Sequence, residues 1–464
     1  MDTALIKTLQ LIVALSLLVV LHEGGHFFFS KLFGVKVEKF FLFFDAWGFK
    51  LFSSRWLGRW FPRLRKNETE YGIGWLPFGG YVKISGMIDE SMDTEQMKQP
   101  PKPHEFRTKP AWQRLLIMTG GVLVNLLLAF FIYAMVLYTW GESYIRPQDM
   151  TYGLQFSEQA KADGFRDGDV ILLTDGDSVR SFSTNVLRDI SNARTVTVLR
   201  SGQEVTLTMP EHMSLLDMIS GESPYADYLN PMNIDSITPG SPAEKAGIRK
   251  GDRITAINGN AITTFNDLVH TLNHLAKPFE DEQVQSTAQK TARQVTLVVN
   301  GTDTVRTELT EDFKLGISNR IATADYHVTE RAYGFFESFP AGISYGWETL
   351  SNYVSDLKYI FTKKGANSVG GFVTMGKIFP DTWDWFKFWN LTAFLSIILA
   401  FMNILPIPAL DGGHVLFLLY EIITRRQPSE KFLERAQMIG MILLFGLLIW
   451  ANGNDILRLL GVIQ

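Results

Sequence analysis

Four long apolar stretches constrain the fold of this 464-residue chain more than any other feature of its sequence. A helix needs about 20 apolar residues to cross a hydrocarbon layer of about 30 Å, because each residue adds about 1.5 Å. The stretches meet this requirement, and ordinary polar sequence separates them. We therefore predict an α-helical membrane protein with four transmembrane helices. These helices are expected within residues 1–34, 111–140, 388–422 and 436–461.

The basic residues of the loops predict the orientation of these helices. The loop at residues 35–110 contains many Lys and Arg, and the short loop after the third helix contains Arg425, Arg426, Lys431 and Arg435. Loops of this kind stay in the cytoplasm. Both termini, and the long segment between the second and third helices, are therefore expected outside the cytoplasm. The first helix lacks the basic opening and cleavage site of a signal peptide, so we expect it to be retained.

Composition excludes several kinds of chemistry and partner. The net charge of -4 and the sequence pI near 6.1 argue against nucleic acid as a partner. Cysteine is absent, which excludes disulfides, a thiolate metal site and a cysteine nucleophile. Any metal ion must therefore be held by His, Asp or Glu side chains.

The segment between the second and third helices contains an internal repeat. The pattern around Asp169 recurs around Asp252, so the two copies are 83 residues apart (169 to 252). Each copy combines Gly turns, a β-rich run and a helix-like segment, which predicts two β-rich domains at residues 141–212 and 225–319. The second copy, with Gly-Ser-Pro-Ala at residues 240–243, resembles PDZ domains, and the first is a weaker match without this opening. This resemblance implies peptide termini as ligands.

Residues 335–387 combine helical spacing of apolar side chains with many aromatic residues. Between residues 341 and 364, apolar side chains such as Ile343 and Trp347 recur on one face of a helix. Such a helix can lie at the membrane interface, where aromatic rings are favoured. An amphipathic helix packed against the two repeats is the alternative, and the sequence does not distinguish the two.

The clearest chemical signal is the run His22-Glu23-Gly24-Gly25-His26, near the end of the first apolar stretch. Residues four apart lie about 40° apart around a helix, so both imidazoles can reach one metal ion. Glu23 projects about 100° from His22, close enough to act on a metal-bound water without binding the metal. This is the arrangement of the H-E-x-x-H zinc hydrolases. The alternative is a chance match, which the cost of a charged residue in a membrane helix makes less favourable.

The two glycines inside this run are unusual for a helix. Each costs about 1 kcal/mol relative to Ala in a helix interior. A close backbone neighbour would explain them, and a local break in the helix is the alternative.

Tetrahedral zinc at a catalytic site needs a third protein ligand and an open position for water. Asp411 is the best candidate, because it follows a turn with two prolines inside the third apolar stretch. Irregular backbone at membrane depth is tolerated where it lines a cavity or is buried in protein. The same turn can place Asn403 near the scissile carbonyl. Asp411 could instead be a helix cap, and we rank His414 below it as a ligand.

These motifs together resemble the site-2 protease family, in the bacterial branch that cleaves membrane-tethered anti-sigma factors. The resemblance covers nearly the whole chain, including the blocks at residues 22–38, 71–84 and 403–413. It implies a bacterial inner membrane protein that binds zinc (Zn2+). The implied roles are zinc ligation by His22, His26 and Asp411, acid and base catalysis by Glu23, and substrate contact by Asn403.

The resemblance also implies a membrane-associated β-hairpin near residues 70–84, inside the cytoplasmic loop. Alternating apolar residues with Gly and Pro also indicate a short hairpin on their own. An exposed strand edge can capture an unwound substrate segment by main-chain pairing. The expected substrate-binding residues are Gly79, Gly80, Tyr81 and Val82. A hairpin with a purely structural role is the alternative.

Two functional hypotheses from different classes follow. In the first, the chain is an intramembrane zinc endopeptidase that cuts the transmembrane segments of single-span proteins, such as anti-sigma factors or remnant signal peptides. In the second, it is a membrane-anchored PDZ scaffold or sensor with a vestigial metal site. A transporter with a proton relay is less favoured, because the apolar stretches show no inverted repeat.

Overall fold

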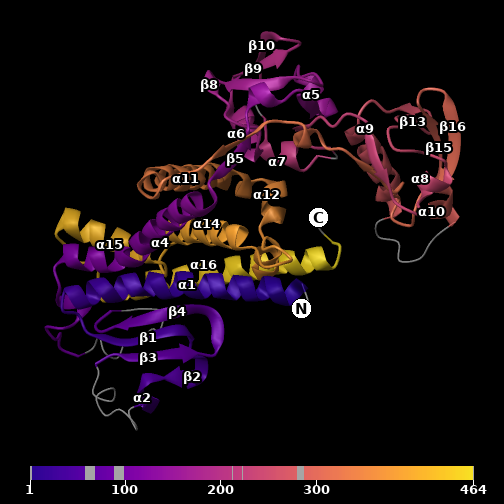
Figure 1. Ribbon diagram of the computed structural model, residues 1–464. Coiled ribbons are helices and arrows are strands. Elements are labelled where there is room, and N and C mark those ends of the chain that lie inside the picture. The colour runs from indigo at the N-terminus through magenta and orange to yellow at the C-terminus, as the bar shows by residue number, and fades with distance from the viewer. Residues whose placement is uncertain are drawn as a thin grey trace. The chain divides into compact units, whose positions relative to one another are not determined.

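The computed structural model describes residues 3–57, 68–87, 99–211, 213–221, 223–279 and 287–462. The chain forms two compact units (Figure 1). The first comprises residues 1–142 and 332–464, and the second comprises residues 143–331. Each unit is described by itself.

Four helices of the first unit are long and apolar enough to cross a membrane. They are α1 (Thr3–Leu32), α4 (Ala111–Trp140), α14 (Trp385–Ile404) and α16 (Glu430–Leu459). Leu, Ile, Val, Phe and Ala fill them, and local caps fix their ends: Asp384 accepts a hydrogen bond from the Lys387 amide at the start of α14, and Ser429 caps α16. Helix α4 packs against α1, α14 and α15 (Asp411–Thr424). This part of the fold agrees with the expected membrane helices.

The apolar stretch at residues 388–422 forms two helices and not one broken span. Helix α14 ends at Ile404, and α15 begins at Asp411 after a turn that contains Pro406 and Pro408. Proline has no amide hydrogen and its ring clashes with a preceding helical turn, so two prolines in three residues end the helix. With 14 residues, α15 is not among the candidate spans in the described part of the chain.

A four-stranded sheet lies between α1 and α4 in the sequence. Its strands are β1 (Val37–Phe44), β2 (Lys50–Ser53), β3 (Glu70–Gly74) and β4 (Leu76–Ile84), in the order β2-β3-β1-β4. Short helices η1 (Ala46–Gly48), α2 (Ser54–Leu57) and η3 (Phe106–Thr108) flank it. Strand β4 is at the edge of the sheet and lies against α1 (Figure 1).

The expected hairpin at residues 70–84 is wrong, because β3 and β4 do not pair with each other. Strand β1 lies between them, parallel to β3 and antiparallel to β4: Leu42 is opposite both Ile73 and Gly80. A single residue, Trp75, separates β3 from β4, which is too short for a two-residue hairpin turn. A Cβ on Gly74 would overlap the Phe44 carbonyl, so glycine lets the chain cross the end of β1.

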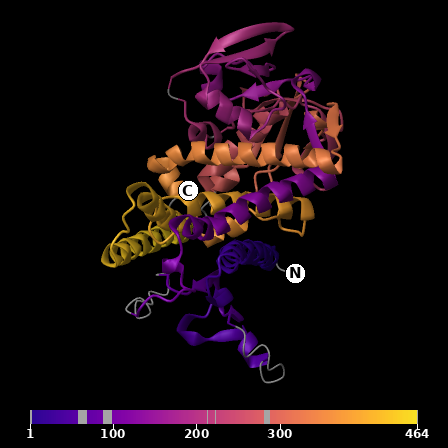
Figure 2. The ribbon, with the colours of Figure 1, turned by 90° about the vertical axis from the view of Figure 1, so that its left-hand side faces the viewer.

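The region at residues 335–387 is mostly helical and packs on the bundle. Its elements are α11 (Phe335–Asp356), η7 (Leu357–Phe361), α12 (Lys363–Ser368) and α13 (Phe372–Lys377). Helix α11 packs against α4 and α14, and Gly346 allows close contact because a Cβ there would lie 2.6 Å from the Phe130 ring. Figure 2 shows α11 lengthwise and α1 nearly end-on, so the two helices run in different directions. Large apolar side chains of α11, such as Trp347, remain exposed.

The second unit contains two modules in which, within the described residues, six strands follow one another in the same order, with short helices between them. Strand β5 (Glu142–Ile145) starts at the boundary between the units and pairs with β18 (Val328–Arg331). The first module has η4 (Pro147–Asp149), β6 (Leu154–Phe156), α5 (Glu158–Ala162), β7 (Val170–Thr174), β8 (Asp177–Ser178), α6 (Thr184–Asn192), β9 (Thr195–Arg200), β10 (Gln203–Thr208), α7 (Leu215–Ile219) and β11 (Ala226–Tyr228). The second has β12 (Ile234–Ile237), α8 (Pro242–Lys245), β13 (Ile254–Ile257), β14 (Asn260–Ala261), α9 (Phe265–Ala276), η5 (Lys277–Phe279), α10 (Thr287–Ala292), β15 (Gln294–Val299), β16 (Asp303–Glu308), β17 (Ile317–Asn319), η6 (Ala322–Ala324) and β18 (Val328–Arg331).

Strand pairing within the modules repeats as well. The sheet β10-β9-β7-β8 corresponds to β16-β15-β13-β14, and the pair β11-β6 corresponds to β17-β12. The first module therefore continues to Tyr228, beyond the expected boundary at residue 212, because β11 pairs with β6. The second module encloses an apolar core that includes Ile234, Ile257 and Leu297.

Candidate metal centre

Helix α1 places His22 and His26 on the face that packs against α4. A Cβ on Gly120 would lie 2.8 Å from the Gly25 carbonyl oxygen, so glycines on both helices allow their backbones to touch. This close approach accounts for Gly25, while Gly24 faces open space and has no such neighbour. The helix is unbroken through this run. The prediction that a close backbone neighbour explains the glycine is therefore confirmed for Gly25. The alternative prediction of a local break in the helix is wrong.

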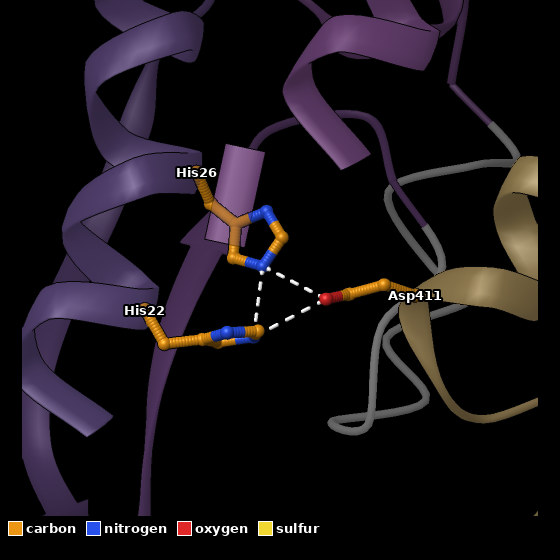
Figure 3. A group of neighbouring side chains, drawn as sticks. All are labelled: His22, His26 and Asp411. Atoms are coloured by element: carbon orange, nitrogen blue, oxygen red, sulfur yellow. Dashed lines mark hydrogen bonds and ion pairs between the residues drawn. The ribbon is translucent and has the colours of Figure 1, made fainter. Parts of the chain in front are cut away.

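The two imidazoles and the Asp411 carboxylate point at one another (Figure 3). The Nε2 atoms of His22 and His26 are 3.2 Å apart, and each is 3.2 Å from Oδ2 of Asp411. Two nitrogens bound to one tetrahedral zinc ion at about 2.05 Å are about 3.3 Å apart. The three atoms therefore already have the spacing that a shared ion requires.

The surroundings of these atoms also fit a cation. His22 and His26 are 9% and 6% exposed, and no other described group donates a hydrogen bond to the buried Oδ2 of Asp411. A buried carboxylate oxygen needs a donor or a cation. The structure brings Asp411 together with the two histidines, as the sequence analysis predicted. His414, the alternative ligand, is not part of this group.

Helix α16 supports the turn that carries Asp411. The Gln437 side chain accepts a hydrogen bond from the Ala409 amide at 3.1 Å. Ala409 has φ of 84°, a conformation that costs energy for a residue with a side chain and persists only where its surroundings hold it. A Cβ on Gly440 would overlap the Pro408 carbonyl oxygen, so α16 touches this turn directly.

The metal-ligand candidates face a cavity of about 660 Å³. Glu23 and Asn403 line it, and the Asn403 side-chain nitrogen lies 3.4 Å from Nε2 of His22. The cavity also contains His414, but that residue lies outside the group of three ligand atoms. The substrate-binding candidates that line it are Gly79, Gly80, Tyr81 and Val82. All candidate site residues of the sequence therefore border one space.

Three residues of this site were not found from the sequence. Asn125 contacts His22, Gln437 holds the Asp411 turn, and Gly121 faces both imidazoles. Asn125 and Gln437 are polar residues inside apolar helices, which is a signal of function in a membrane segment. Gly121 carried no such signal, because its importance lies in the space that a side chain would fill.

Replacing Gly121 by Ala should weaken the metal site. A Cβ there would lie 2.5 Å from Nε2 of His26 and 2.7 Å from Nε2 of His22, so both imidazoles would have to move. We expect zinc affinity to fall by about 10-fold or more, as for other changes that disturb ligand orientation. Competition with a chromogenic chelator measures this affinity. Gly24→Ala is the matched control and should bind zinc normally; equal affinity in the two variants would contradict the steric argument.

The fold and the site define a helical protein whose described residues include four helices long and apolar enough to cross a membrane, and three residues that could hold a metal ion. A family model described as Peptidase family M50 matches residues 10–447, and the chain belongs to this family. The family expected from the motifs is therefore confirmed.

Curated relatives match over almost their full length. The chain is 28% identical over 472 residues to a putative zinc metalloprotease of Vibrio cholerae, covering 97% of this chain and 98% of the relative. It is 29% identical over 464 residues to the regulator of sigma-E protease RseP of Escherichia coli, with the same coverage. A regulator of sigma E protease of Haemophilus influenzae is 28% identical over 466 residues, again with 97% and 98% coverage.

Proposed function

We propose that this chain is an intramembrane zinc endopeptidase that hydrolyses peptide bonds in the transmembrane segments of single-span proteins. One observation carries the proposal: His22, His26 and Asp411 converge at 3.2 Å in a bundle of apolar helices, although the sequence separates Asp411 from the histidines by most of its length. Relatives named zinc metalloprotease support zinc as the metal.

Five polar residues of the cavity have roles in the proposed reaction. His22, His26 and Asp411 would hold zinc, which supplies a Lewis acid for the scissile carbonyl and for the attacking water. The Glu23 carboxylate takes a proton from that water and returns it to the nitrogen of the leaving amine. The Asn403 amide, which borders the same cavity, donates a hydrogen bond to the scissile carbonyl oxygen.

Strand β4 provides a way to bind an unwound substrate. A helical substrate satisfies its own backbone hydrogen bonds, so a protease must replace them when it opens the helix. Strand β4 is an edge strand within the described residues, and Gly80 and Val82 on it line the cavity. A substrate segment that pairs with this edge would lie extended beside the metal centre.

The substrate class and the topology follow from the relatives and the loop charges. Relatives named regulators of sigma-E protease favour the span of an anti-sigma factor as substrate, with remnant signal peptides as a second source. We place the chain in the bacterial inner membrane with both termini and the two PDZ-like modules outside the cytoplasm. The modules would bind peptide termini.

Purified protein tests this proposal directly. We expect about one zinc ion per chain and cleavage of a single-span reporter in liposomes. A zinc chelator should stop cleavage, and added zinc should restore it, because Glu23 has no activated water to act on without the metal. A scaffold with a vestigial site predicts neither stoichiometric zinc nor cleavage, so that result would reject the proposal.

A further inference from the structure

Asn125 lies at the junction of three helices of the bundle. It is one turn after Gly121 on α4, it is 0% exposed, and it borders the same cavity as the metal-ligand candidates. Its backbone carbonyl accepts a hydrogen bond from Ser396 on α14 at 2.7 Å. Its side-chain nitrogen Nδ2 lies 3.2 Å from Nδ1 of His22 on α1. The backbone of Asn125 is therefore fixed, and its side chain is directed at a candidate zinc ligand.

The two histidines have different partners on the nitrogen that faces away from Asp411. Nδ1 of His26 lies 2.8 Å from the Ile117 carbonyl oxygen, which can only accept. His26 must therefore carry its proton on Nδ1, and its Nε2 is free to bind a metal ion. Ile117 thus sets the correct tautomer of His26 without any rearrangement.

His22 has no such fixed acceptor. An amide nitrogen can only donate, so Nδ2 of Asn125 requires an unprotonated Nδ1 on His22. The proton of His22 is then on Nε2, where it can be donated to Oδ2 of Asp411 at 3.2 Å. This tautomer suits the metal-free site but blocks the nitrogen that must bind zinc.

The side-chain oxygen of Asn125, Oδ1, can favour the tautomer of His22 that binds zinc. Oδ1 of Asn125 is buried and has no hydrogen-bond partner within the described residues. Rotating the amide by about 180° exchanges Oδ1 and Nδ2 with almost no change of shape. Oδ1 would then accept a hydrogen bond from Nδ1 of His22, which leaves Nε2 of His22 free for the metal.

We propose that Asn125 is a positioning residue that holds His22 in its metal-binding tautomer through Oδ1. Histidine ligands of zinc commonly donate their second ring nitrogen to such an acceptor, and its removal typically costs about 10- to 100-fold in metal affinity. This inference rests on the proposed function, because it requires His22 to be a zinc ligand. A purely structural role for the Asn125 side chain is less consistent with its contacts, since His22 is its only hydrogen-bond partner within the described residues.

The test compares Asn125→Leu and Asn125→Asp with the unaltered chain. Leu has the same number of side-chain heavy atoms with the same branching and no acceptor, so zinc affinity should fall about 10- to 100-fold. Asp retains an oxygen toward Nδ1 of His22 and should restore affinity to at least the original value. Competition with a chelator measures affinity, and the visible spectrum of the cobalt-substituted protein reports the ligand geometry, which should change in Asn125→Leu alone.

Thermal unfolding of the zinc-free proteins separates positioning from packing. Asn125→Leu removes the unsatisfied Oδ1 together with the hydrogen bond from Nδ2 to His22, two changes with opposite effects on stability, so its zinc-free form should unfold near the original temperature. Ser396→Ala is the control for packing at the same junction, and it should lower the unfolding temperature while leaving zinc affinity unchanged.

The outcomes distinguish this inference from the proposed function. If the unaltered chain binds one zinc ion and Asn125→Leu binds zinc equally tightly, the inference is overturned and the proposed function stands. Failure of Asn125→Asp to restore affinity also overturns it. An unaltered chain without stoichiometric zinc would overturn both proposals.

Discussion

Replacing Glu23 by Gln should lower the rate of substrate cleavage by about 10²- to 10⁴-fold, the usual contribution of a general base. Gln has nearly the same shape as Glu but cannot accept a proton from the attacking water. Glu23 lines the cavity next to His22 but is not one of the three candidate metal ligands. Its replacement should therefore not remove the metal. The expected result is thus an inactive chain that still contains zinc.

The measurement combines two assays on the same purified variant. Zinc content should stay near one ion per chain, while cleavage of a single-span reporter in liposomes should nearly stop. Glu38→Gln is a matched control, because Glu38 forms an ion pair with Lys83 at 3.6 Å and does not line the cavity. Cleavage at the original rate by Glu23→Gln would remove Glu23 from the mechanism, and loss of zinc would indicate a structural role.

The part of the site that could be predicted from the sequence depends on local geometry and on a requirement for ligands. His22 and His26 share a helix face because residues four apart do so in any α-helix, and α1 is such a helix. Asp411 followed from the need for a third ligand and from its position after a proline turn. Both arguments hold without knowing how the helices pack.

The order of the strands could not be predicted in the same way. Alternation and turn residues identify β3 and β4, but they do not show that β1 will lie between them. That order depends on contacts between segments far apart in the sequence. A Cβ on Gly72 would overlap the Phe41 ring. The glycines of this segment, which the sequence analysis interpreted as turn residues, instead make room for the aromatic side chains and the backbone of β1.

The residues that hold the ligands in place were also hidden from the sequence. Asn125 on α4 contacts His22 on α1, and Gln437 on α16 accepts a hydrogen bond from the Ala409 amide in the turn before α15, so both contacts join segments far apart in the sequence. A pattern within one helix cannot reveal its partner in another. The polar character of these side chains within apolar helices was the available signal, and it would have identified them as candidates without giving their roles.

Replacing Asp411 by Ala should remove zinc from the purified protein and abolish cleavage. Two imidazoles alone leave a zinc site with half of its tetrahedral positions unfilled by protein, whereas Oδ2 of Asp411 completes the group at 3.2 Å from each Nε2. Loss of a direct ligand should exceed the about 10- to 100-fold loss of affinity that follows from removing an outer partner. Zinc analysis and chelator competition measure this change.

His414→Ala is the decisive control for this prediction. His414 borders the same cavity three residues later on α15, and it is the alternative ligand that the sequence allows. If Asp411 is the ligand, His414→Ala should keep its zinc, and Asp411→Ala should lose it even when His414 is present. The reverse result would assign the third position to His414 and would require α15 to move by about 4.5 Å along its axis and to rotate by about 60°, because each helical residue adds about 1.5 Å and 100°.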